Sequence, residues 1–230
     1  MAVFTQLAAA TASTTNATSY AGTAGTPAAG DMLICFVMAS GLTTAGSLTG
    51  GGFTWTNITS FTKNAGADVI SVFWTYAATA TSTTPTFATG GVTATGCVIS
   101  CVRCSGLLDQ TSYTNSLKQP IATNTGSTIN PSVTFGSALT STSGVLGFAT
   151  NGTNSTNQWT APTGFTEISE VAYNTPANSG ETVSIGNGAS GTTLTWTNAN
   201  TTAWGVIAIE LSSVVSTSFD PFGQLGFYGL

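Results

Sequence analysis

The fold of this chain is decided by the stretch Asp31-Met32-Leu33-Ile34-Cys35-Phe36-Val37-Met38, which is apolar at every position after the first. A second apolar run, Gly205-Val206-Ile207-Ala208-Ile209, lies near the end of the chain. Short apolar runs rich in β-branched and aromatic residues favour strands that are covered on both faces. Between them, Ser71-Val72-Phe73-Trp74-Thr75-Tyr76 shows the alternation of a strand with two different faces. The three stretches predict β-structure with buried central strands.

The composition of the whole chain agrees with β-structure. Of the 230 residues, 46 are Thr and 25 are Ser, and 5% are charged, against roughly a quarter in an ordinary globular protein. The usual fillers of exposed helix faces, Lys, Glu, Gln and Arg, are scarce, whereas Thr, Val, Ile and the aromatic residues favour strands. We expect an all-β protein with strands near residues 31–38, 53–61, 69–76, 86–88, 97–103, 127–135, 144–149, 165–171, 181–185, 192–196 and 204–211.

The two halves of the chain resemble each other. Gly52-Phe53-Thr54 recurs as Gly164-Phe165-Thr166, and each copy is followed by a Thr-aromatic strand and a long apolar closing strand. This doubling predicts one jelly-roll β-sandwich with two Greek keys or, as the alternative, two small tandem sandwiches. We prefer the jelly roll because each half alone would have a marginal core. The expected organisation is an N-terminal arm over 1–25, a jelly roll over 26–213 with halves at about 30–106 and 127–213, and an apolar tail over 214–230.

The charge of the chain restricts its partners. It carries 3 basic and 8 acidic residues and no histidine, a net charge of −5. Nucleic acids and anionic membranes are bound through many Lys and Arg side chains, so we expect neither as a partner. No apolar stretch is long enough to span a bilayer, and the uncharged N-terminus does not look like a secretory signal peptide. An unprocessed chain whose surface suits the outside of a cell is typical of a virion protein released by lysis.

Three of the four cysteines, Cys97, Cys101 and Cys104, lie close together in the sequence. In a strand the first two would point to one face and Cys104 to the other, unlike the turn-borne pairs of zinc sites. We interpret them as small buried hydrophobic residues, and expect no bound metal or cofactor. A disulfide between Cys35 and one of the other three is the second interpretation, and a metal site is the third.

Catalytic groups are sparse in this sequence. Glycoside hydrolysis needs two carboxylates at a set separation, but the closest pair in sequence, Glu167 and Glu170, would face opposite sides of a strand. The many serines have no histidine to act as their base, and Lys63 or Lys118 would have to replace it without a recognisable motif. We therefore expect no enzymatic activity.

Five short segments follow one another along the chain: Gly30-Asp31-Met32-Leu33-Ile34, Gly52-Phe53-Thr54, Phe73-Trp74-Thr75-Tyr76-Ala77, Thr86-Phe87 and a closing strand ending at Ser105-Gly106. Their succession resembles a pattern met in phage virion proteins and lectin-like bacterial surface sandwiches. The resemblance covers roughly residues 30–213, more loosely in the second half. It implies a lectin-like or jelly-roll sandwich and no catalytic residue. The chain lacks the Asp and Arg residues usual in that pattern, which argues against a bound ion.

The last twelve residues differ from the rest of the chain because they hold four aromatic residues and two leucines. We expect this tail to dock on a neighbouring subunit, since aromatic side chains dominate the energy of protein interfaces. The alternative is that it folds back as an edge strand on its own domain. Together with two anchors in the N-terminal arm, the expected interface residues are Phe219, Pro221, Phe222, Leu225, Phe227, Tyr228, Leu230, Phe4 and Leu7.

These observations favour a structural virion protein, specifically a bacteriophage capsid decoration (cement) protein. We expect a homotrimer on the outer surface of the virion, bound through its apolar arms to a major capsid protein or another virion protein. One alternative is a tail-fibre or surface adhesin domain that binds host glycans, with Trp55, Trp159 and Trp196 near turns or strand ends as the candidate contacts. The other is a subunit of a self-assembling extracellular filament or coat.

Overall fold

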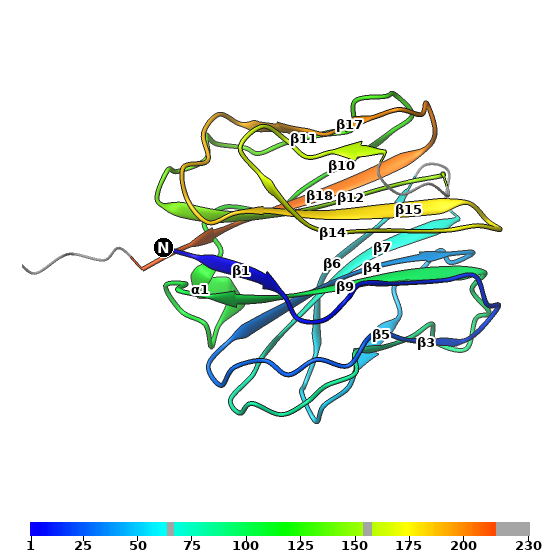
Figure 1. Cartoon of the computed structure of the whole chain (residues 1–230), viewed down its shortest axis with the longest axis horizontal. Coiled ribbons are helices and arrows are strands. Elements are labelled where there is room, and N and C mark those ends of the chain that lie inside the picture. Colours follow the sequence, from blue (N-terminus) through cyan, green and yellow to red (C-terminus); the bar gives the residue numbers. More distant parts are fainter. Residues whose placement is uncertain (64–66, 154–157, 215–230) are drawn as a thin grey trace, which may run out of the picture.

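The computed structural model describes residues 1–63, 67–153 and 158–214, which form two large antiparallel sheets stacked face to face (Figure 1). The first sheet has the order β1 (Val3–Gln6), β9 (Gly96–Ser105), β4 (Met32–Ser40), β7 (Asp68–Tyr76) and β6 (Thr56–Lys63), and β2 (Thr11–Ser13) also pairs with β9. The second sheet has the order β10 (Ala122–Gly126), β18 (Trp204–Ser212), β12 (Ser143–Asn151), β15 (Asn178–Ile185) and β14 (Thr166–Tyr173). Within the described ranges the single helix is α1 (Tyr113–Ser116), so the prediction of an all-β protein is confirmed.

Each large sheet also has a cover of short strands on its outer side. The first sheet is covered by β3 (Ser19–Ala21), β8 (Thr86–Ala88) and β5 (Ser47–Thr49). The second is covered by two pairs, β11 (Ser132–Thr134) with β16 (Thr193–Thr195) and β13 (Trp159–Thr160) with β17 (Thr197–Asn198). Figure 1 shows these covers above and below the two large sheets. Because the central strands are covered on both sides, every residue of β4 and of β12 is buried, as the continuous apolar run of β4 predicts.

The space between the two large sheets is filled by side chains from both halves of the chain. Phe36 of β4 stacks on Phe148 of β12 with ring centroids 5.4 Å apart, and both rings are fully buried. A small group of hydroxyls crosses the same interface, since Ser100 Oγ lies 3.0 Å from Ser169 Oγ and accepts a hydrogen bond of 2.8 Å from Thr182. The two sheets therefore share one core.

The two large sheets are built in the same way from the two halves of the chain. Strands β4, β6, β7 and β9 lie in the spatial order β9-β4-β7-β6, and strands β12, β14, β15 and β18 lie in the order β18-β12-β15-β14. In chain order both are 4-1-3-2, whereas a Greek key has the order 4-1-2-3. The jelly-roll part of the expectation is therefore not confirmed.

The sequence suggests a separate arm over the first 25 residues. In the structure these residues are part of the sandwich. Strands β1 and β2 pair with β9, and β3 pairs with β8. Phe4 packs against the core between the sheets, and Leu7 is buried beneath the cover of the first sheet. Both expected anchors are thus used inside their own chain.

Candidate functional site

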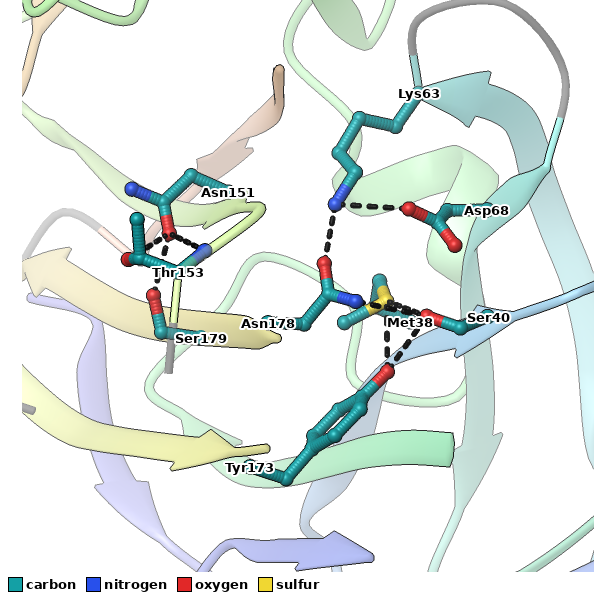
Figure 2. Close-up of polar contacts among 9 residues, drawn as sticks. All are labelled: Met38, Ser40, Lys63, Asp68, Asn151, Thr153, Tyr173, Asn178 and Ser179. Carbon is teal, nitrogen blue, oxygen red and sulfur yellow. Dashed lines mark hydrogen bonds and ion pairs between the residues drawn. The ribbon is translucent and has the colours of Figure 1, made fainter. Parts of the chain in front are cut away.

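A polar layer closes one end of the core between the two large sheets (Figure 2). In the first sheet, Ser40 pairs in register with Asp68, and Asp68 with Lys63, so these three residues form a row across β4, β7 and β6. In the second sheet, Tyr173 at the end of β14 pairs with Asn178 at the start of β15. The two rows face each other, as their hydrogen bonds show.

The five side chains form one connected network. Lys63 Nζ lies 3.0 Å from Asp68 Oδ2 and donates to Asn178 Oδ1. Asn178 Nδ2 donates to Ser40 Oγ at 2.8 Å, and Ser40 Oγ lies 2.7 Å from the Tyr173 hydroxyl. Lysine, asparagine, serine and tyrosine are all buried, and only the Asp68 side chain, at 22% exposed, retains appreciable contact with solvent. The layer joins the two sheets through polar bonds alone.

Local sequence explains how these groups come to face inward. Lys63 lies two residues after Phe61, which packs on the core, so strand alternation turns Lys63 to the same side. Gly96 of β9, which pairs with Ser40, leaves room for the Tyr173 ring, because a Cβ at this position would lie 2.4 Å from Tyr173 Cε2. The absence of a side chain on β9 thus allows a tyrosine of the second sheet to reach Ser40.

Burial changes the protonation of this layer. Removal from water lowers the pKa of Lys63, and the neighbouring Asp68 carboxylate opposes part of that effect. Burial also raises the pKa of Tyr173, which therefore stays a neutral hydroxyl. Lys63 is consequently easier to deprotonate than an exposed lysine while it remains in contact with a carboxylate.

A second polar group lies on the other face of the second sheet, at the same end (Figure 2). Ser179 Oγ donates to Asn151 Oδ1 at 2.6 Å and accepts from Trp159 Nε1 at 3.1 Å. The Thr153 hydroxyl donates to the same Asn151 oxygen at 2.8 Å. These bonds fasten the short β13 strand of the cover to the sheet, which is a structural role.

The acidic residues of β14 and β15 share one face, which corrects the expectation that Glu167 and Glu170 point to opposite sides. A bulge shifts the register of β14 between Glu167 and Ser169, so Glu167 pairs with Val183, and Glu170 pairs with Glu181. Glu181 is fully buried, and its pKa is raised to about 8. Burial is the main cause, and the nearby Glu167 and Glu170 carboxylates add to it. In the part of the chain that the structure describes, no cluster of three or more His, Cys, Asp or Glu residues has the arrangement needed to hold a metal ion.

The three tryptophans expected to contact glycans do not form an exposed platform. Trp196 is fully buried and Trp159 is 6% exposed, both in the core beneath the second sheet's cover. Trp55 is partly buried against the core of the first sheet's cover. The choice of Trp159 and Trp196 as sugar contacts is therefore wrong, because the covering strands make these turn-proximal positions internal.

A hollow that sequence reasoning missed lies near the opposite end of β7. It is lined by Phe53, Trp74 and Tyr76 together with small residues of the 51–54 and 78–79 segments. All three aromatic side chains are partly buried, so part of each is exposed. The Phe53-Thr54 turn was visible in the sequence, but only the folded structure brings it beside the end of β7.

The cysteines behave in part as expected. Cys97 and Cys101 point to the outer face of the first sheet and Cys104 to the inner face, which confirms the predicted alternation. Cys35 and Cys101 are directly opposite each other on β4 and β9 and form a disulfide, the second of the interpretations drawn from the sequence. Cys97 and Cys104 are free and buried.

The expected docking residues of the tail, Phe219, Pro221, Phe222, Leu225, Phe227, Tyr228 and Leu230, lie outside the described residues. The last described residues before that tail lie beside the N-terminus, at the same end of the sandwich (Figure 1). The amino group of Met1 donates to Val214 O at 3.0 Å, and Leu108 N donates to Ser212 O at 2.9 Å.

Exposed apolar side chains belong to these same joined segments. Met1, Val3, Leu108 and Val214 are 58%, 45%, 61% and 46% exposed, and they are four of the six exposed large hydrophobic residues among those described. Val3 lies on β1 beside Ser105, directly before the loop that carries Leu108. We call these four residues the apolar end.

The polar layer was not predicted from the sequence. The sequence offers Lys63 only as a substitute base for a serine, and it gives Asn178 no distinguishing pattern. One hint is present in the sequence. Lys63 is one of three basic residues, and it lies two positions after Phe61, so in a strand it points to the same apolar face.

No helix among the described residues has the length and apolar character needed to cross a membrane. Comparison with protein-family models, with curated proteins and with solved structures gave no match to this chain.

Proposed function

We propose that this protein is a structural virion component, specifically a bacteriophage capsid decoration (cement) protein that binds the shell through its apolar end and the tail that follows it. The observation that carries the proposal is the position of the apolar end. Four exposed hydrophobic side chains lie on segments joined by backbone hydrogen bonds, and one of these segments ends at Val214 and leads to the aromatic-rich 219–230 stretch. An exposed apolar patch of this kind is typical of a binding surface.

The physical basis of such binding is burial of apolar surface. Each Phe or Leu side chain of the tail that becomes fully buried on a partner contributes about 1.5–3 kcal/mol before the cost of ordering the tail is subtracted. A homotrimer would present three such tails to a symmetric shell. Because 5% of the chain is charged, this contact is expected to depend little on salt.

The repeated 4-1-3-2 strand order supports a further part of the proposal, an origin of the sandwich by internal doubling. Both doubled sheets are covered on their outer sides, and their surface hydroxyls replace charges. Such a body suits a passive structural role, in which the ends of the chain provide the binding.

The proposal is tested by removing residues 219–230 and measuring how much protein remains on purified, undecorated capsids after sedimentation. We expect occupancy to fall at least tenfold, with an unchanged circular dichroism spectrum. A matched pair of variants tests the apolar end: Leu108→Asp should weaken binding, whereas Ile129→Asp, at a similarly exposed residue outside the apolar end, should not. Unchanged occupancy after truncation and in Leu108→Asp would refute the proposal.

Glycan binding remains the second candidate because of the hollow lined by Phe53, Trp74 and Tyr76. Partly exposed aromatic side chains beside threonines could stack against sugar rings. On a glycan array, an adhesin would show saturable binding that is lost in Phe53→Ala. An array without any saturable signal leaves the decoration function as the better supported one.

A further inference from the structure

The buried amine of Lys63 faces the side-chain carboxamide of Asn178, and each residue is only 2% exposed. Lysine is almost never fully buried, so its position inside a sandwich requires a reason. Among the described residues, two side chains bond to the amine, the Asp68 carboxylate and the Asn178 carboxamide. The amine, a nucleophile, is thus in direct contact with an acyl group and with a group able to carry protons.

The carboxamide is held in one orientation. Protonated Lys63 Nζ can only donate, so the Asn178 atom facing it must be the oxygen. Asn178 Nδ2 then points to Ser40 Oγ at 2.8 Å, and Ser40 in turn lies 2.7 Å from the Tyr173 hydroxyl. Ser40 and Tyr173 therefore keep the carboxamide turned with its carbonyl toward the amine.

We propose that Lys63 and Asn178 form an intramolecular isopeptide bond, with Asp68 as the group that moves the protons. The inference does not depend on the proposed function, because it concerns only groups inside this chain. The bond would join β6 of the first sheet to β15 of the second, across residues 115 apart in sequence.

The reaction exchanges one amide for another. The Lys63 ammonium gives a proton to Asp68, and the neutral Nζ adds to Asn178 Cγ. A second proton passes from Nζ through Asp68 to Nδ2, the Cγ–Nδ2 bond breaks, and ammonia leaves, taking up the remaining proton as ammonium. Nζ keeps one hydrogen in the new amide, Asp68 returns to its carboxylate form, and no oxidant or other reactant is needed.

The surroundings favour both the reaction and the persistence of its product. Burial lowers the pKa of Lys63, so less free energy is needed to obtain the neutral amine. The Asp68 side chain is 22% exposed and gives protons and ammonia a route to solvent, while Lys63 and Asn178 themselves are screened from the water that would hydrolyse the bond. Ser40 and Tyr173 act as positioning residues.

The test is mass spectrometry of the purified full chain after denaturation, reduction and alkylation. We expect the intact mass to be lower than that of the unlinked chain by one molecule of ammonia. Trypsin cleaves after Lys63, Arg103 and Lys118, but not after an acylated lysine. The linked chain should therefore yield residues 1–103 and 119–230 as one branched product, with no separate 1–63 fragment. A succinimide at some asparagine would show the same mass loss but would leave the fragments separate.

Three variants complete the experiment. Lys63→Met and Asp68→Asn should both carry the full unlinked mass, and none of their tryptic fragments should be joined to another. Lys118→Met, a matched loss of one cation, should still lose ammonia. Near-ultraviolet circular dichroism shows whether each variant is folded. The wild-type measurement needs no variant, so a folded wild-type chain with the full mass and a free 1–63 fragment overturns the proposal. Retention of the bond in folded Asp68→Asn overturns the role given to Asp68.

Discussion

Truncation of Phe148 to alanine tests whether the two sheets unfold as one unit. Phe148 belongs to the second half of the chain, yet its ring stacks on Phe36 of the first at 5.4 Å with an interplanar angle of 12°. Both rings are fully buried, and Phe-to-Ala changes in such cores cost about 3–5 kcal/mol. A Cβ on Gly180 would lie 3.0 Å from the Phe148 ring, so backbone packs closely against it and cannot readily collapse into the cavity. We therefore expect a loss in the upper part of that range.

The assay is urea unfolding followed by tryptophan fluorescence and by far-ultraviolet circular dichroism. Trp55 and Trp74 report on the first half, and Trp159, Trp196 and Trp204 on the second. If the sheets share one core, Phe148→Ala and Phe36→Ala each shift a single transition that both probes follow. The double variant should lose less than the sum of the two by about 0.5–1.5 kcal/mol, the usual coupling of a stacked pair. Two separate transitions, with only one of them moved by Phe148→Ala, would refute the shared core.

Two further measurements test the polar interior. Gly96→Ala should destabilise the protein by about 1–3 kcal/mol in the same urea assay, because its Cβ would collide with Tyr173 at 2.4 Å; an unchanged midpoint would contradict the close approach. Glu181→Gln should remove a pH dependence of stability. The pKa of Glu181 is raised to about 8 in the folded chain and is about 4.3 for an unfolded glutamate. Between pH values of about 4.3 and about 8 the folded state therefore binds more protons than the unfolded state, so the stability of the protein falls as the pH rises through this interval. The same slope in both proteins would show that Glu181 is not its source.

Local pattern was enough to predict the strands that are buried on both faces. The continuous apolar runs of β4 and β18 and the alternation of β7 appear where the sequence placed them, and so do the opposite faces of Cys101 and Cys104. In each case a single strand carries the whole signal, because the period of the side chains is set by the backbone.

Features that depend on a distant partner could not be predicted in this way. The segment over residues 3–21 is rich in Thr and Ala and has no apolar period, so only its pairing with β9 and β8 makes it part of the sheet. The bulge before Ser169 reversed the face of Glu167 relative to Glu170, and the cover over the second sheet buried Trp196. The polar layer combines residues from both halves, which no local window contains.

The pairing of β1 and β2 with β9 has a consequence for how the chain is made. Residues 3–13 are synthesised long before their partners at residues 97–105, and β4 also lacks its β9 neighbour until those residues have been made. Such distant pairings put folding in the range of about milliseconds to seconds, which is slow for one domain. During synthesis the apolar β4 strand therefore emerges before β9, which covers one of its edges, and exposed apolar strands of this kind are prone to aggregation until folding is complete.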